Sequence, residues 1–283
     1  MTTHAARDLS ALDDVRLAAA LAEGAGEVLL QLRRDADATD WSITDRAGDL
    51  RKAGDAGAQA WLAAALTGAR PTDAVLSEEA VDDPRRLLAD RVWIIDPLDG
   101  TREFGERLEH GGWRNDFAVH VALWRRDTGL AGGAVALPAC GVTYSSGTPV
   151  LPDPTAAAEV LGGMRPIRVA VSRTRPPEVA QAIADRGDVN LIPMGSTGAK
   201  VARVLDGTVD AYVHAGGQHE WDSAAPVVVA QAAGFVATRL DGSPLVYNQP
   251  RPWSPDLVVC HPALTAHLRA LLAAAGVVGV SLA

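Results

Sequence analysis

Hydrophobic residues recur at two different spacings along the chain, and these predict helices and strands in a definite order. Over Leu12–Leu32 and Ala56–Leu66 they recur three or four positions apart, which is the period of an amphipathic helix. The polar segment from Asp35 to Asp49 is predicted to be a loop. Phe117–Trp124 alternates every second residue, as a strand does. Short apolar runs predict further strands at 74–77, 92–95, 132–137 and 142–146.

Strands and helices alternate in the second half of the chain. Strands are predicted over 167–171, 190–193, 209–214, 235–238 and 257–260, and helices over 177–184, 196–205, 223–233 and 263–275. The Pro-, Ala- and Gly-rich segment Leu151–Gly163 is the predicted join. We therefore expect one unit of two subdomains, an α+β half with a mixed sheet over residues 1–150 and an α/β half over residues 164–283.

Composition limits the classes of function. The chain has 283 residues, of which 48% are hydrophobic, so a sizeable core is expected. A formal net charge of −9 argues against a nucleic-acid partner, which would require a basic face. Cys140 and Cys260 have no partner at metal-site spacing. The N-terminus lacks the pattern of a signal peptide, and no apolar run is long enough to span a membrane. We expect a cytoplasmic protein.

Two carboxylates follow directly on an apolar run. Val92–Ile95 leads into Asp96-Pro-Leu-Asp99, where the proline is expected to end the hydrogen bonding of the strand. Carboxylates this close repel each other unless a cation lies between them, and Mg²⁺ prefers such oxygen ligands. Gly100 and Thr101 come next and offer backbone N–H groups and a hydroxyl to an anion. A simple polar turn would have the same pattern.

Four further carboxylates lie beside predicted elements. Asp55 and Asp222 each precede a predicted helix, and Glu78 with Glu79 follows the strand at 74–77. The ordinary explanation is a helix N-cap for each aspartate and a solvated rim for the glutamates. Spacing alone does not bring these groups together, so their convergence on one metal site is a hypothesis.

Three motifs resemble those of the inositol monophosphatase superfamily, whose members are lithium-sensitive, Mg²⁺-dependent phosphatases. The motifs are Leu76-Ser-Glu-Glu79, Trp93-Ile-Ile-Asp-Pro-Leu-Asp-Gly-Thr101 and Trp221-Asp-Ser-Ala-Ala225. The match runs in the family's order from about Asp55 to Asp241. The resemblance implies a layered αβαβα fold in which both halves form one catalytic unit.

The resemblance also implies a set of metal ligands. Glu78, Asp96 and the backbone carbonyl of Leu98 would hold one Mg²⁺, and Asp96, Asp99 and Asp222 would hold a second. Two carboxylate-bound metal ions suit phosphate ester hydrolysis by an activated water, without a protein nucleophile. The haloacid-dehalogenase phosphatases, which use an aspartyl nucleophile in Asp-x-Asp, are the nearest rival, but the spacing here is one residue too long for them.

Phosphate and water complete the implied site. Gly100 and Thr101 would bind the phosphate through their N–H groups, and Asp55 with the Thr101 hydroxyl would orient or deprotonate the attacking water. The family's Thr-x-x-Asp stands here as Lys52-Ala-Gly-Asp55. The missing threonine weakens the case for a third metal ion, so the expectation is two or three Mg²⁺ ions per chain. Asp49 is the alternative to Asp55. The expected catalytic residues are Asp55, Thr101 and Glu78.

Other segments resemble the CysQ type, the 3′-phosphoadenosine 5′-phosphate phosphatases of this family. They are Arg102-Glu-Phe104, Val171-Ser-Arg-Thr-Arg175, Gly195-Ser-Thr-Gly-Ala-Lys200 and Tyr212-Val-His-Ala-Gly-Gly217. Inositol phosphatases carry a sugar-binding glutamate where this chain has Ala215. The expected substrate-binding residues are Leu98, Asp99, Gly100, Thr101, Ser172, Arg173, Gly195, Ser196, Lys200 and Asp222.

A bisphosphate substrate needs a second anion site. Ser196 and Thr197 at a helix start, with Lys200 one turn on, could meet the second phosphate, as could Arg173 or Arg175. The alternatives are a plain N-cap for Ser196 and ordinary solvated charges for the cations. No role is assigned to His110, His120, His214 or His219.

The favoured reaction is hydrolysis of 3′-phosphoadenosine 5′-phosphate to AMP and phosphate. An inositol-1-phosphate or fructose-1,6-bisphosphate phosphatase is the alternative, and a non-catalytic nucleotide or metal sensor is the rival from another class. A homodimer is implied by the resemblance.

Overall fold

The computed structural model describes residues 8–38, 46–185 and 188–277. Its helices are α1 Asp14–Asp37, α2 Arg46–Ala69, α3 Thr101–Phe104, α4 Pro154–Leu161, α5 Glu178–Ala184, α6 Thr197–Leu205, α7 Glu220–Ala232 and α8 Thr265–Ala274. Its strands are β1 Ala74–Ser77, β2 Arg91–Asp99, β3 Ala118–Arg125, β4 Gly129–Leu137, β5 Val142–Ser145, β6 Ile167–Ser172, β7 Val189–Met194, β8 Ala211–His219, β9 Val236–Thr238 and β10 Trp253–Cys260.

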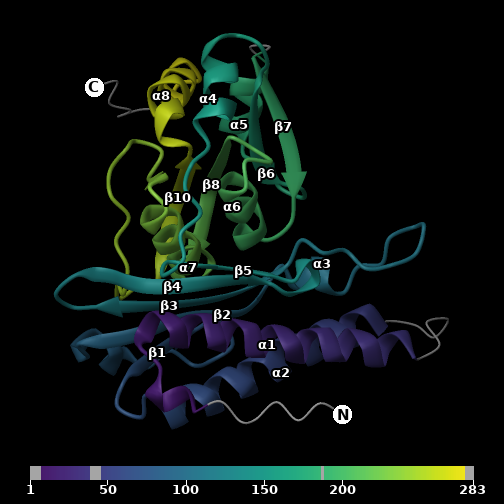
Figure 1. Cartoon of the computed structure of the whole chain (residues 1–283), viewed down its shortest axis with the longest axis vertical. Helices are drawn as coiled ribbons and strands as arrows, with labels where there is room; N and C mark the ends of the chain where they lie inside the picture. The colour runs from purple at the N-terminus through teal and green to yellow at the C-terminus, as the bar shows by residue number, and fades with distance from the viewer. Residues whose placement is uncertain (1–7, 39–45, 186–187, 278–283) are drawn as a thin grey trace.

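The elements form five layers, as Figure 1 shows. Helices α1 and α2 cover one face of a sheet with the strand order β1-β2-β3-β4-β5. Helices α6 and α7 lie between this sheet and a second one, ordered β7-β6-β8-β10-β9, whose far side carries α4, α5 and α8. The expected αβαβα fold is confirmed. We retain the division into halves at 151–163 as a proposal, since each sheet is built from one half.

Both sheets mix parallel and antiparallel pairs. In the first, β1 and β2 are parallel, with Ser77 opposite Ile95, and β2 to β5 are antiparallel. In the second, β6 is parallel to β7 and β8, while β10 is antiparallel to its neighbours. Because β1 and β2 run the same way, the residues that follow them meet at one edge of the sheet.

Strand β2 is buried on both faces, which explains its continuous apolar run. Trp93 and Ile95 pack into the core under α1 and α2, whereas Val92 and Ile94 pack into the core around α6 and α7. Alternate residues of β2 thus pack into two different core layers, and the acidic C-terminal end of the strand lies between these layers.

The predicted loop before Asp55 is wrong in part. Helix α1 continues to Asp37 and α2 already begins at Arg46, so Asp55 lies in the interior of a helix and is not its N-cap. Residues 39–45 of that prediction lie outside the described residues. The first turns of α2 carry few apolar residues, and packing fixes them instead. A Cβ on Gly54 would lie 2.6 Å from the Phe104 ring and 2.9 Å from the Leu98 side chain, so a glycine is needed there.

Other boundaries also differ from the predictions. Strand β2 runs on to Asp99, but its register with β3 breaks between Asp96 and Asp99, where Pro97 has no N–H to donate. Helix α7 starts at Glu220, so Asp222 lies in its first turn and accepts the His219 N–H. The predicted join contains α4, and the short helix α3, which the sequence did not predict, begins at Thr101.

Candidate active site

Asp96 is almost completely enclosed, with 1% of its surface exposed. Its Oδ1 accepts the Leu98 N–H at 3.0 Å, but the buried Oδ2 has no hydrogen-bond partner within the described part of the chain. Burial and the neighbouring carboxylates of Glu78 and Asp99 raise the pKa of Asp96 well above its usual value. A buried carboxylate oxygen without a partner is an unusual and costly arrangement in a protein, and a cation would relieve it.

Glu78 and Asp222 approach Asp96 from two other elements. Glu78 follows β1 at the accessible rim, where reduced contact with water and repulsion from Asp222 raise its pKa to about 7. Asp222, at the start of α7, has a pKa raised to about 6 by burial and by Asp99. These shared shifts show that the four carboxylates interact, although they come from separate segments of the chain.

Asp99 differs from its acidic neighbours because the protein itself compensates its charge. Its Oδ2 accepts hydrogen bonds from Ser196 Oγ at 2.5 Å and the Gly198 N–H at 2.7 Å, and His120 Nε2 lies 3.1 Å away. Burial alone would raise the pKa of Asp99, yet His120 and these hydrogen bonds outweigh it and lower the pKa. Asp99 is therefore the carboxylate most firmly held in its charged form.

Thr101 and Asp55 form a second group of site residues, joined by a hydrogen bond. The Thr101 hydroxyl is 3.2 Å from Asp55 Oδ1 and 3.2 Å from the Leu98 carbonyl oxygen. Burial and repulsion from Glu79 raise the pKa of Asp55 to about 6. The structure thus brings Asp55 to Thr101, whereas Asp49 is exposed in the first turn of α2.

Gly100 is required at the turn between these groups. Its φ of 91° lies in the left-handed region, and a Cβ would come within 3.2 Å of both the Asp116 carbonyl oxygen and Ser196 Cβ. Helix α3 then begins at Thr101, so its first N–H groups have no partner within the helix.

The residues present fit Mg²⁺ by their chemistry. Oxygen atoms from Glu78, Asp96, Asp99 and Asp222 are the hard ligands that this ion prefers, and Asp96 Oδ2 has no other partner. Among the residues that the structure describes, no three acidic, histidine or cysteine side chains are grouped so that they could hold a metal ion as they stand. Some of the carboxylate oxygens instead accept hydrogen bonds, as Asp99 Oδ2 and Asp222 Oδ2 do.

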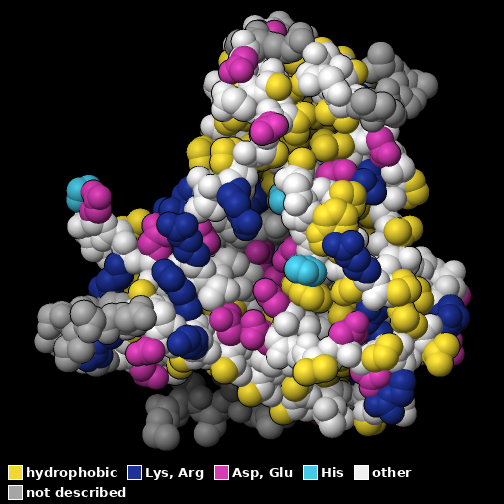
Figure 2. Space-filling view, turned by 180° about the vertical axis from the view of Figure 1, so that it is seen from behind, with side chains coloured by type: hydrophobic (Ala, Val, Ile, Leu, Met, Phe, Trp, Pro, Cys, Tyr) yellow, Lys and Arg dark blue, Asp and Glu magenta, His cyan; other side chains and the backbone are white. Residues whose placement is uncertain are grey.

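A cavity of about 630 Å³ opens beside this cluster. Figure 2 shows acidic side chains at the floor of a hollow and basic side chains around it. The lining combines residues that follow β2 with residues of α6, β8 and the segment after β6. Its predicted members are Asp99, Gly100, Thr101, Ser172, Arg173, Gly195, Ser196, Lys200 and Asp222. The volume is in the usual range for a small-molecule site.

The residues predicted to bind an anion line this cavity, and they differ in their hydrogen-bond partners within the protein. Ser196 is indeed the N-cap of α6, since its Oγ accepts the Ala199 N–H at 3.0 Å, and it also binds Asp99. Lys200 is 5% exposed and donates to the Gly195 carbonyl oxygen at 2.5 Å. Burial lowers its pKa. Ser196 and Lys200 therefore both have structural partners, in addition to facing the cavity.

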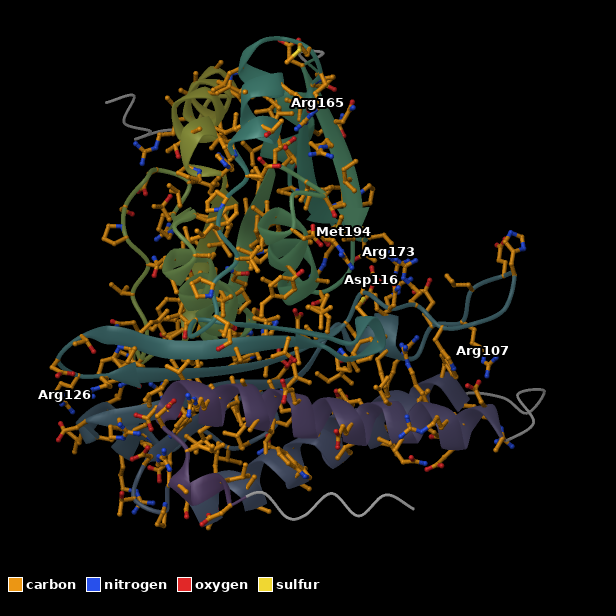
Figure 3. The ribbon with its side chains drawn as sticks, in the orientation of Figure 1. Arg107, Asp116, Arg126, Arg165, Arg173 and Met194 are labelled. Carbon is orange, nitrogen blue, oxygen red and sulfur yellow. The ribbon has the colours of Figure 1, made fainter. Side chains whose placement is uncertain are left out.

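Arg173 is paired with two acidic residues. Its Nη2 lies 2.6 Å from both Glu103 Oε1 and Glu106 Oε2. Figure 3 shows Arg173 beside Asp116, close to the end of β7 and above α3. Asp116 in turn accepts the Gly195 N–H at 2.7 Å. An anion would have to compete with these glutamates for Arg173.

Two site residues were missed by the sequence analysis. His120 is fully buried between Asp99 and the Trp221 carbonyl oxygen, 3.2 Å from its Nδ1. Asp116 holds Gly195 and is itself bound by Arg114. The position of His120 in a predicted strand gave a weak signal of a role, because a histidine that is buried among apolar residues needs a hydrogen-bond partner. Nothing in the local pattern distinguishes Asp116.

Comparison with known proteins assigns this arrangement to a family. The sequence model of the inositol monophosphatase family matches residues 11–274. The chain belongs to this family. Its members are generally Mg²⁺-dependent phosphatases, so the resemblance found in the sequence is confirmed. Within the described residues, no helix has the length and apolar character needed to cross a membrane.

Individual proteins can also be compared with this chain by sequence identity and by structure. The 3′-phosphoadenosine 5′-phosphate phosphatase of Mycobacterium leprae is 49% identical over 271 residues, 92% of this chain and 94% of that protein. The protein of the same name from Mycobacterium bovis is 50% identical, over 83% of this chain and 84% of its own. The crystal structure of CysQ from Bacteroides thetaiotaomicron superposes with a TM-score of 0.65 at 28% identity, covering 87% of this chain and 96% of that one.

Proposed function

We propose that this enzyme hydrolyses 3′-phosphoadenosine 5′-phosphate, with water, to AMP and inorganic phosphate. The observation that carries the proposal is the carboxylate cluster around the unpaired Asp96 Oδ2, which opens into a cavity large enough for a nucleotide. The two mycobacterial relatives bear the name of this activity, which supports the choice of substrate. We propose the cytoplasm as its location and a homodimer as its assembly, which light scattering would test.

We propose that Glu78, Asp96 and the Leu98 carbonyl hold one Mg²⁺ and that Asp96, Asp99 and Asp222 hold another. When bound, these ions would lower the pKa of a water and stabilise the charge of the phosphoryl group and the leaving oxygen. The protein's own contribution begins with Asp99, which His120, Ser196 and Gly198 keep charged and oriented.

The Thr101–Asp55 pair is suited to handle the proton of the attacking water. With its proton donated to Asp55 Oδ1, the Thr101 oxygen can accept a hydrogen bond from water. The pKa of Asp55, raised to about 6, makes it a better proton acceptor than an ordinary aspartate while leaving it ionised at neutral pH. The N–H groups at the start of α3, which have no partner within the helix, would meanwhile hold the phosphate.

The cations of the cavity favour a bisphosphate over a monophosphate. Lys200 lies in the wall with Arg173 and Arg175, in a chain whose net charge is −9. Cations gathered at one cavity of an acidic protein suit a second phosphate group. Because Arg173 is paired with Glu103 and Glu106, we assign the buried Lys200 the larger part of this contact.

The test is phosphate release in Mg²⁺ from 3′-phosphoadenosine 5′-phosphate, inositol 1-phosphate and fructose 1,6-bisphosphate at matched low concentrations. We expect the nucleotide to be favoured roughly a hundredfold, equivalent to about 2.7 kcal/mol of transition-state discrimination. Comparable rates on all three would instead assign a broad sugar-phosphate phosphatase. If nucleotide binds but no substrate releases phosphate, the sensor hypothesis replaces the enzyme.

A further inference from the structure

The side chain of Gln218 is unusual among the residues that line the active-site cavity. Gln218 is the penultimate residue of β8 and is 7% exposed. Both polar atoms of its amide, Oε1 and Nε2, are buried and have no hydrogen-bond partner among the residues that the structure describes. Buried polar groups almost always have partners, because losing water without replacement costs free energy. An amide of this kind at a cavity wall is therefore a candidate contact for a ligand.

The backbone places Gln218 beside the carboxylate cluster. The next residue, His219, donates its N–H to Asp222 Oδ2 at 2.7 Å. Gly216 and Gly217, with φ of 101° and 94°, turn the chain immediately before Gln218. A Cβ on Gly217 would lie 2.4 Å from the Trp253 ring, so this turn is fixed by packing. Gln218 thus lies near the place where the proposed function puts the scissile phosphate.

We propose that Gln218 binds the ribose 2′-hydroxyl of the substrate and so makes the enzyme selective for ribonucleotides. This inference rests on the proposed function, since the 2′-hydroxyl is the neighbour of a scissile 3′-phosphate. Oε1 is an acceptor and Nε2 a donor, so the amide can accept from the hydroxyl and donate to the adjacent 3′-oxygen. Because no hydrogen bond holds the amide in place, turning it toward the ribose breaks none.

Gln218 has no place in the water activation, and it adds to the substrate contacts expected from the sequence. A substrate lacking the 2′-hydroxyl would leave the amide unpaired. A site built to hydrogen-bond a hydroxyl rejects an analogue without it for this reason.

The experiment compares kcat/KM for adenosine 3′,5′-bisphosphate and its 2′-deoxy analogue in the Mg²⁺-loaded enzyme. The variants are Gln218→Leu and Gln218→Met, and Gln181→Leu is the control, because Gln181 is exposed on α5 and its side chain donates to Asp185 Oδ1. We expect the preference for the ribonucleotide to be roughly tenfold smaller in both Gln218 variants than in wild type. The intrinsic effect of the hydroxyl on the ester cancels in this ratio of ratios.

Thermal unfolding without substrate separates recognition from a structural role. Replacing an unpaired buried amide by an apolar side chain should leave the melting temperature unchanged or raise it by roughly 2–4 °C. A preference that stays as in wild type overturns the inference. So does an equal loss on both substrates together with a lower melting temperature. If wild type releases phosphate from neither nucleotide, the proposed function fails and this inference fails with it.

Discussion

Replacing Asp222 by asparagine would measure the repulsion within the carboxylate cluster. Asparagine keeps an oxygen that can accept the His219 N–H, but it removes the charge that faces Asp99 and Glu78. The raised pKa of Asp222, about 6 against 3.8, means that folding disfavours its ionised form. Without divalent ions, the variant should therefore be more stable than wild type at neutral and alkaline pH.

The magnitude follows from the pKa difference. Two pH units correspond to roughly 3 kcal/mol, and we reduce this to about 1–2 kcal/mol because Asp222 is partly exposed to solvent. In a chain of this size each kcal/mol moves the melting temperature by roughly 2–4 °C. The folded pKa is the higher one, so the cost is absent below about pH 4 and is complete above the folded value of about 6.

The assay is thermal unfolding at pH 5 and pH 8, each with a chelator and with saturating Mg²⁺. With chelator we expect Asp222→Asn to melt above wild type by roughly 2–8 °C at pH 8 and by less at pH 5. In Mg²⁺ the order should reverse, because a ligand that binds wild type at a hundred times its Kd adds about 2.7 kcal/mol. Asp185→Asn, at an exposed position, is the control. A variant that melts below wild type at pH 8 with chelator would refute the reasoning.

Three further substitutions test separate parts of the site. Thr101→Val should lower kcat by roughly 10²–10⁴-fold, because Asp55 loses its link to water, and Mg²⁺ binding measured by calorimetry should stay close to wild type. Lys200→Met should raise KM for the bisphosphate roughly tenfold and change that for a 3′-monophosphate much less, so equal effects on both substrates would count against a second anion site. His120→Ala should weaken Mg²⁺ binding roughly 10–100-fold, because Asp99 loses the contact with His120 that orients it. His120→Asn should restore part of this binding. An unchanged calorimetric affinity in the alanine variant would show that His120 does not position Asp99.

The sequence predicted most of the fold because its strongest signals lie in buried strands. Val92–Ile95 reads as a strand in isolation, and the structure confirms it within β2. The partnership of Glu78 with Asp96 follows from one topological fact, the parallel pairing of β1 with β2. Spacing alone could not supply that fact, and the family resemblance did. The helix predicted from the sequence is shorter than α2, because the first turns of α2 lack an apolar stripe and are held by contacts with α3.

Pairings between distant residues could not be predicted. Arg173 is separated by some seventy positions from Glu103 and Glu106, so the sequence analysis could assign its charge only to the second phosphate or to solvent. His120 and Gln218 lie in strands whose alternation shows only which face they occupy. Whether a buried polar side chain has a partner depends on elements that pack against it from elsewhere in the chain, and local pattern contains no record of that.

The pKa shifts divide the carboxylates by what compensates their charge. Asp99 has a lowered pKa because His120 and the hydrogen bonds from Ser196 and Gly198 outweigh the effect of burial. Asp96 has a raised pKa, and so do Glu78 and Asp222, because mutual repulsion and burial are opposed by few donors. Groups of the protein therefore keep the Asp99 carboxylate charged. For Asp96, Glu78 and Asp222 an added cation has to do so. Binding of Mg²⁺ should consequently release protons near pH 6–7, where Asp222 and Glu78 titrate, and the proton release should fall toward zero at pH 9.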